Sequence, residues 1–447
     1  MNTNANSGMP SMFKMTWPIF VETLLQMLVG YVDQFMISRY NEDMVGAMTN
    51  ANQLINIIIL VFGVVSTAST ILIAQYLGAE NHEKVKEIYT LAIAMDIAIG
   101  LVISLAVFLL ADELAVWFSI PPNMTEFFIE YTRIVGGFMT VQAVFLGFSA
   151  FFKSNGLMSY TMIFALVMNA VNIVGNWFFI YGKGPFPEMG IRGAAIATIS
   201  SKIIGLVLII IVYCYKIKIP ISPKMLVPFP KDMFLRIVKI GVPAAGENIS
   251  YDMSQLVILI FVNWLGSVEV TTRSYGYMFS WLCCIFTMSV GNALRIMVGY
   301  LIGAGRHDDA TKVIKKSLIA SMLISVGTTL IILTFSDAFY GIFTDNPEIL
   351  VLGKQILYAE IALEIGRTIN VIMVSSLQAA GDIKFPVMLG IISNWSVAAL
   401  LSYIFGIVFG WGLVGIWAAM ATDECLRGII YLFRFRSGVW RKKNIMS

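Results

Sequence analysis

The sequence has few charged residues and only two histidines. Asp, Glu, Lys and Arg together make up 13% of the 447 residues, about half of their usual share in a soluble domain. Hydrophobic residues make up 58%, and the mean hydropathy is +0.80. A soluble fold is therefore excluded, and we expect most of the chain to be surrounded by lipid.

Signatures of several other protein classes are also missing. The chain has no G-x-x-x-x-G-K-[ST] loop and no room for a soluble ATP-binding domain. No basic patch with interleaved aromatic residues points to nucleic acid, and the net charge is only +3. His82 and His307 fall in predicted loops, and the four cysteines lack metal-ligand or disulfide spacing. We therefore expect no cofactor and no enzyme, and a membrane-embedded enzyme remains only as a remote alternative.

Long apolar runs are abundant. A membrane-spanning helix needs about 20 apolar residues, and runs bounded by Gly, Pro and charged clusters predict twelve such helices. They cover residues 14–38, 47–75, 88–110, 127–152, 160–181, 190–216, 236–265, 272–300, 315–335, 350–378, 385–409 and 411–433. The first run has the length of a span and lacks a small-residue cleavage site, so we expect it to be retained. The predicted fold class is an all-α polytopic membrane protein.

Basic residues are unevenly distributed between the two sides of the predicted membrane. If both termini are cytoplasmic, most of the 30 Lys and Arg residues lie in inside loops, as the positive-inside rule requires. The segment 217–235 is rich in Pro and Lys and is predicted to be a cytoplasmic linker. It divides the chain into an N-terminal six-helix lobe, residues 1–216, and a C-terminal six-helix lobe, residues 236–447. We expect a monomer in a prokaryotic plasma (inner) membrane.

The two lobes are copies of one unit. A shift of 225 residues superimposes Pro18 on Pro243, Glu22 on Glu247, Gly78 on Gly303, His82 on His307, and Asn169 on Asn394. Because each copy has six spans, both copies enter the membrane from the same side, and a pseudo-two-fold axis along the membrane normal relates them. Two such lobes that rock around a midplane cavity would provide alternating access, so the repeat favours a transporter.

Short motifs occur along the chain in a specific order. They are YVDQFMIS (31–38), LGAENHEK (77–84), NIVGNW (172–177), GIRGAAIAT (190–198), LIGAGRHDDA (301–310) and QAAGD (378–382). Each is weak alone, but with this order and spacing the chain resembles the multidrug and toxic compound extrusion family along nearly its whole length. The resemblance implies two six-helix bundles and the exchange of Na⁺ or H⁺ for amphipathic, often cationic compounds.

Asp33, in the outer half of the first predicted helix, is the leading candidate for coupling. A carboxylate inside a membrane is costly, and this one could bind Na⁺ or alternate between charged and neutral forms. Asn172 and Asn176 share a helix face, and their amide oxygens suit a hard cation. The resemblance implies an N-lobe cation site of Asp33, Asn172, Asn176 and Thr198, with Na⁺ at the first three. Structural hydrogen bonding by Asp33 and interhelical packing by the asparagines are the alternatives.

Further carboxylates are candidates for a second site. Glu22 and its repeat counterpart Glu247 could attract a cationic substrate to the cavity, or could cap helices disturbed by proline. Glu360, Glu364 and Arg367 share one helix face, where Glu364 and Arg367 could pair for structural reasons alone. The resemblance marks the carboxylates of the seventh and tenth helices as a C-lobe cation or substrate site. Its candidate residues are Glu247, Asp252, Glu364 and Arg367.

The leading functional hypothesis is secondary antiport. Inward movement of Na⁺ or H⁺ would shift the equilibrium between inward-open and outward-open states and expel a small organic substrate. Beyond substrates and membrane lipid we expect no partner, and no nucleic acid. Because related two-lobed folds move lipid-linked precursors, a flippase is the main alternative.

Overall fold

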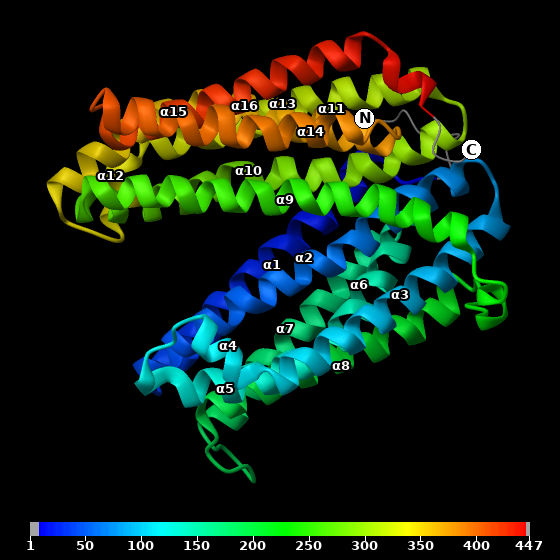
Figure 1. Ribbon diagram of the computed structural model, residues 1–447, viewed down its shortest axis with the longest axis horizontal. Helices are drawn as coiled ribbons and strands as arrows, with labels where there is room; N and C mark the ends of the chain where they lie inside the picture. Colours follow the sequence, from blue (N-terminus) through cyan, green and yellow to red (C-terminus); the bar gives the residue numbers. More distant parts are fainter. Residues whose placement is uncertain (1–8, 444–447) are drawn as a thin grey trace. The chain divides into compact units, whose positions relative to one another are not determined.

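The computed structural model describes residues 9–443 of the chain, and in this range it contains helices and turns but no strand (Figure 1). The first half contains six helical segments long enough to span a membrane. They are α1 (Met12–Ser38), α2 (Glu42–Gly78), α3 (His82–Leu109), the pair α5 (Pro122–Gly137) and α6 (Met139–Ser154), α7 (Met158–Ile180) and α8 (Gly190–Lys216). The short helix α4 (Ala111–Trp117) links α3 to α5.

The second half repeats this order. Its long segments are α9 (Lys231–Leu265), α10 (Ser267–Gly303), α11 (His307–Thr334), α13 (Pro347–Ala379), a composite helix and α16 (Gly412–Arg436). The composite helix joins α14 (Lys384–Ser393), the π-helical η2 (Asn394–Ala399), α15 (Leu400–Tyr403) and the π-helical η3 (Ile404–Val408). The shorter elements are η1 (Pro223–Leu226), α12 (Ser336–Gly341) and η4 (Val439–Lys442). The prediction of twelve spans is confirmed.

Not all twelve segments are equally apolar. Within the described residues, eight helices are each long and apolar enough to cross a membrane, and the pair α5–α6 adds a ninth. The segments α9, α13 and α16 have 35, 33 and 25 residues, so length does not limit them. Charged residues lower their hydropathy, and we expect such residues to face the protein interior because a charge in lipid is costly.

Helix boundaries follow the repeat. The helices α3 and α11 begin at His82 and His307, and α5 and α13 begin at Pro122 and Pro347, so the offset of 225 residues is preserved. Local chemistry explains these starts. The side chain of Asn81 caps α3 by accepting a hydrogen bond from the backbone N–H of Lys84 at 3.1 Å. Proline suits the first turn of α5 and α13 because the N–H that it lacks would have no helical partner there.

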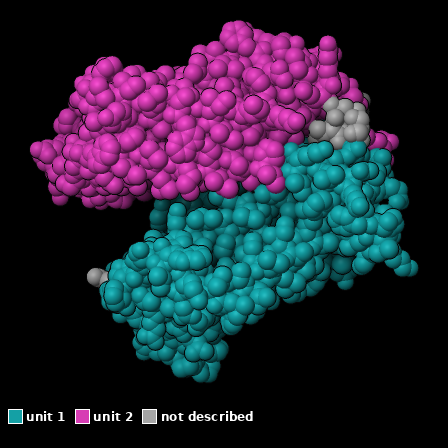
Figure 2. Space-filling view, in the orientation of Figure 1, with its two compact units in different colours: residues 1–76, 81–241 teal, residues 77–80, 242–447 magenta. Residues whose placement is uncertain are grey.

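The chain forms two compact units (Figure 2). Unit 1 comprises Met1–Tyr76 and Asn81–Gly241, and unit 2 comprises Leu77–Glu80 and Val242–Ser447. The predicted linker 217–235 contains η1 and the first residues of α9. The division of the chain into lobes at this linker stays a prediction.

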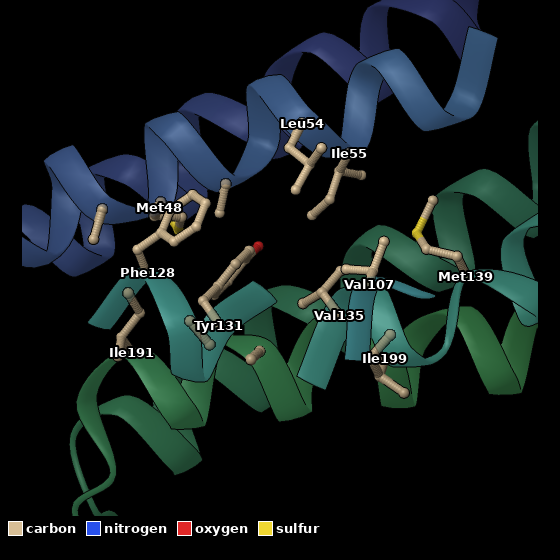
Figure 3. Close-up of a cluster of buried hydrophobic side chains, with 14 of the residues drawn as sticks. Met48, Leu54, Ile55, Val107, Phe128, Tyr131, Val135, Met139, Ile191 and Ile199 are labelled. Carbon is tan, nitrogen blue, oxygen red and sulfur yellow. The ribbon is translucent and has the colours of Figure 1, made fainter. Parts of the chain in front are cut away.

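An apolar core fills the part of unit 1 between α2, α3, α5 and α8 (Figure 3). Figure 3 shows Phe128 and Tyr131 of α5 pointing toward Met48, Leu54 and Ile55 of α2. All five side chains are less than 10% exposed, so burial of their apolar area stabilises this contact between helices. The core therefore fixes α5 and α8 beside the polar residues described below.

Candidate cation sites

Asp33 is part of a chain of hydrogen bonds that links three helices of unit 1. The side-chain amide of Asn176 donates to Asp33 Oδ1 at 2.6 Å and lies 3.3 Å from Asn172 Oδ1. The amide of Asn172 in turn donates to Thr198 Oγ1 at 3.3 Å. The four residues predicted for the N-lobe site therefore lie together, on α1, α7 and α8. Their role in cation binding stays a prediction.

Close packing of α7 between α1 and α8 brings these groups together. Small residues allow the short distance between α7 and α8. A side chain on Gly193 would collide with the backbone of Phe179, and one on Gly175 would come within 3.0 Å of Ala197. The four-residue spacing of Asn172 and Asn176 then places both amides on the face of α7 that the other helices cover.

One acceptor in this chain of hydrogen bonds has no donor among the described residues. Asn176 is fully buried, and its Oδ1 atom has no hydrogen-bond partner within the described part of the chain. Because the amide N–H₂ must face the Asp33 carboxylate, the oxygen cannot exchange places with it. A buried acceptor without a donor is costly. The carboxylate and the nearby amide and hydroxyl oxygens form the kind of ligand set that a hard cation prefers.

Two residues near this site escape prediction from the sequence. The phenol of Tyr131 lies between α2 and α8, within 3.4 Å of Asn52 Oδ1 and in hydrogen-bonding contact with Thr198. Lys202, for which the sequence indicates no partner, interacts electrostatically with Asp33. The tyrosine resembles an ordinary core aromatic in the sequence. The lysine, four residues after Thr198 on α8, could have been found by its helical spacing.

Glu22 and Glu247 have equivalent neighbours in the two units. In unit 1, Lys153 donates to Glu22 Oε1 at 2.8 Å, and Thr161 donates to Glu22 Oε2 at 2.8 Å. Gln378 stands at the position equivalent to Lys153, and its amide donates to Glu247 Oε2 at 3.3 Å. Glu22 therefore forms an ion pair with a lysine, whereas Glu247 accepts its hydrogen bond from a neutral amide and interacts electrostatically with Arg295 and Arg427.

A group of two carboxylates and one guanidinium lies inside unit 2. The Arg367 guanidinium contacts Glu364 directly and is 3.6 Å from Glu360. The remaining oxygens also have donors, because the indole of Trp417 donates to Glu360 Oε2 at 2.6 Å and Ser325 donates to Glu364 Oε2. Ser280 donates to Glu360 Oε1. Both carboxylates are nearly inaccessible, with exposed fractions of 1% and 0%.

A second group has the same composition. On α16, Arg427 lies 2.6 Å from Asp423 and 2.9 Å from Glu424. Asn370 of α13 donates to Glu424 at 2.5 Å, and Ser393 of α14 donates to Asp423. The group therefore connects three helices of unit 2.

The remaining candidate, Asp252, makes no ion pair within the described residues. Asp252 is exposed on α9, a helix that also carries the half-buried Glu247. Another carboxylate, Asp96 of α3, is 1% exposed, and its Oδ2 atom has no hydrogen-bond partner within the described residues. Of the residues predicted for unit 2, Glu364 and Arg367 are in direct contact, and Glu247 interacts electrostatically with Arg427 of the second group. Their role in binding a cation or a substrate stays a prediction.

Comparison with known proteins identifies the family. The MatE family model matches residues 18–178 and 243–404, which together cover more than half of the chain. The chain belongs to the MATE family of transporters. The family model matches once in each copy of the repeat, and the family predicted from the sequence motifs is confirmed.

Relatives and solved MATE structures extend along the same length. The uncharacterized transporter YisQ of Bacillus subtilis is 35% identical over 435 residues, covering 97% of this chain and 96% of YisQ. A probable multidrug resistance protein NorM of Thermotoga maritima is 27% identical, with 98% and 94% covered. A crystal structure of MATE in the straight conformation is 17% identical and has a TM-score of 0.87, with 97% and 96% covered. A MOP superfamily transporter from Pyrococcus furiosus is also 17% identical and has a TM-score of 0.86, with 97% of this chain and 96% of the Pyrococcus chain covered.

These likenesses define the class of the protein. It is a multi-pass membrane transporter of the MATE family and not an enzyme. Its relatives include proteins named for multidrug resistance. The solved structures share its fold, with twelve spans in two six-helix lobes.

Proposed function

We propose that this MATE transporter is a secondary active antiporter. It exchanges Na⁺ or H⁺ for amphipathic, cationic organic compounds by alternating access, and exports them through a prokaryotic plasma membrane. Both termini lie in the cytoplasm, the protein acts as a monomer, and no cofactor is needed beyond the coupling ion. The names of the relatives support the choice of multidrug export, and the uneven distribution of basic residues supports the orientation.

The observation that carries this proposal is the acceptor cluster at Asp33. A buried carboxylate and an amide oxygen without a donor lie side by side between α1 and α7. Both gain a favourable interaction when a cation binds, and the carboxylate alone gains one when a proton binds. A conformation that presents this cluster is therefore stabilised by the coupling ion, which is the requirement for a shift in the conformational equilibrium.

The two ionic groups of unit 2 support a coupling role for that unit as well. Each group contains two carboxylates and one guanidinium, so each carries a surplus negative charge when fully ionised. A surplus charge away from water is costly until a proton or a cation neutralises it. Unit 2 can therefore contribute a second place for protons or for a cationic substrate.

Transport in sealed vesicles tests the proposal. Purified protein is reconstituted, and efflux of a fluorescent organic cation is followed under a Na⁺ gradient and, separately, under a proton gradient. We expect efflux under at least one gradient, and we expect Asp33→Asn to abolish it, because the amide cannot bind or release a proton and ligates a cation weakly. Asp112→Asn is the matched control, since Asp112 is an exposed partner of Arg133 near the end of a span.

Two results would contradict this assignment. Undiminished export by Asp33→Asn would remove Asp33 from the coupling step. Absence of export by the unmodified protein under both gradients would argue against drug antiport altogether. Thermal unfolding in detergent should give similar midpoints for the two variants, so that lost transport is not confused with lost structure.

A further inference from the structure

Lys202 carries a charge at the centre of α8. It lies 12 residues after Gly190 and 14 residues before Lys216, so each helix end is roughly 20 Å away. A lysine stem is too short to bring its ammonium to either surface from this depth. A charge at such a depth is costly and needs a polar partner inside the protein.

The position of Lys202 on the helix points to the Asp33 cluster. Residues four apart share a helix face, so Lys202 lies one turn from Thr198, whose hydroxyl accepts from Asn172. Lys202 is half-buried, and its electrostatic partner is Asp33. The helical spacing thus places Lys202 on the face of α8 that carries Thr198, and α8 packs against α7.

The unpartnered Asn176 Oδ1 atom offers an independent reason for a cation here. It is buried beside the Asp33 carboxylate, and it needs a donor or a positive charge. An ammonium has three N–H donors and one positive charge, so it can satisfy the same oxygens as a metal cation. Lys202 and a coupling cation therefore suit the same acceptors.

We propose that Lys202 is a tethered competitor of the coupling cation at Asp33. Its ammonium offsets the charge of the carboxylate in the ion-free site without a direct ion pair, and a cation that enters the site must overcome the repulsion of that ammonium. The coupling ion thereby competes with a charge that belongs to the protein. The site is neutral in the ion-free state and carries one surplus positive charge when Na⁺ is bound.

The effect of the Lys202 charge on Na⁺ affinity is large enough to measure. With one carboxylate and one ammonium, the site gains a net positive charge when Na⁺ binds. Repulsion between unit charges about 6 Å apart, at an effective dielectric constant of about 20, corresponds to roughly 100-fold in affinity. Partial hydration weakens this repulsion, so we expect removal of the Lys202 charge to strengthen Na⁺ binding at least about tenfold.

Titration of the purified full-length protein with NaCl tests the proposal, with binding heat as the readout at constant pH and ionic strength. Lys202→Met should bind Na⁺ at least tenfold more tightly than the unmodified protein, whereas Lys202→Arg should not. Lys216→Met removes the same charge at the exposed end of α8 and should leave the affinity unchanged. Asp33→Asn added to Lys202→Met should abolish the strengthened binding. If Lys202→Met does not fold, Lys202→Gln replaces it.

Equal or weaker Na⁺ affinity in the charge-free variant would overturn the proposal, and so would the absence of saturable Na⁺ binding in it. The inference rests on the proposed function only in taking Asp33 as the cation site. Because the titration contains no organic substrate, its outcome is independent of drug export. Failure of export with strengthened Na⁺ binding would contradict the antiport proposal alone.

Discussion

Residues 122–154 and 347–379 occupy equivalent places in the two copies of the repeat, but the first segment forms two helices and the second forms one. The pair α5–α6 bends by 44° at its break, whereas α13 continues for 33 residues. The first segment contributes apolar side chains and Tyr131 to a core. The second carries Glu360, Glu364 and Arg367. Helix ends are thus conserved between the copies, while the interior differs in both shape and charge.

The break has a local cause and a tertiary one. Gly136 and Gly137 precede it, and glycine is a poor helix former. A side chain at Gly136 would come within 2.3 Å of Val107, so the glycine also permits close contact with α3. The backbone N–H of Thr140, just after the break, donates to Ser104 of α3 at 3.0 Å. At the equivalent positions, α13 has Ile361 and Ala362, and the helix continues.

The difference extends to the candidate sites. The counterparts of Asp33, Asn172 and Asn176 in the second copy are the apolar residues Ile258, Val397 and Leu401. Conversely, the counterparts of Glu364 and Arg367 in the first copy are Met139 and Gln142. Each unit therefore has its own polar interior, and duplication has preserved the scaffold without preserving the chemistry.

Removal of the Arg367 charge should have the largest effect on stability. Arg367→Met leaves Glu360 and Glu364 buried without their shared cation, so we expect the free energy of unfolding to fall by about 3 kcal/mol. The control is Gln142→Met, the same new side chain at the equivalent position of unit 1, where we expect less than about 1 kcal/mol. Thermal unfolding in detergent measures both. Equal losses would show that the charges of α13 contribute no more than ordinary packing.

Removal of the Lys153 charge should have a smaller effect. Lys153→Gln gives unit 1 the residue that unit 2 has at this position, and leaves the buried Glu22 without a cation. We expect a loss of roughly 2 kcal/mol, because the 26% exposure of the lysine side chain moderates the cost. Addition of Glu22→Gln should restore most of the lost stability in the same unfolding assay. If the double variant is no more stable than the single one, Lys153 and Glu22 do not stabilise the fold as an ion pair.

Much of the fold could be predicted from the sequence, because hydropathy, helix length and repeat offset are properties of the chain itself. The break between α5 and α6 could not, since it depends on an acceptor supplied by Ser104 of another helix. For the same reason, the sequence did not predict the neighbours of Glu22. These are Lys153 and Thr161, which are separated from Glu22 by 131 and 139 residues. Within the site, helical spacing placed Asn172 and Asn176 on one face. Their contact with Asp33 depended on the packing of α1 against α7 and entered the prediction through the family resemblance.

The smallest effect that we expect concerns the acceptor at the α5–α6 break. Ser104→Ala removes the oxygen that binds the Thr140 N–H and leaves a half-buried donor unsatisfied, which should cost about 1 kcal/mol in thermal unfolding. Thr329 is the equivalent residue on α11; its hydroxyl donates to the carbonyl of Ser325 in its own helix and contacts the side chain of Cys283. Thr329→Val should therefore cost less, because α13 has no break that needs an acceptor. A loss for Ser104→Ala no larger than that for Thr329→Val would show that the break in unit 1 is maintained by the glycines and not by the bond to α3.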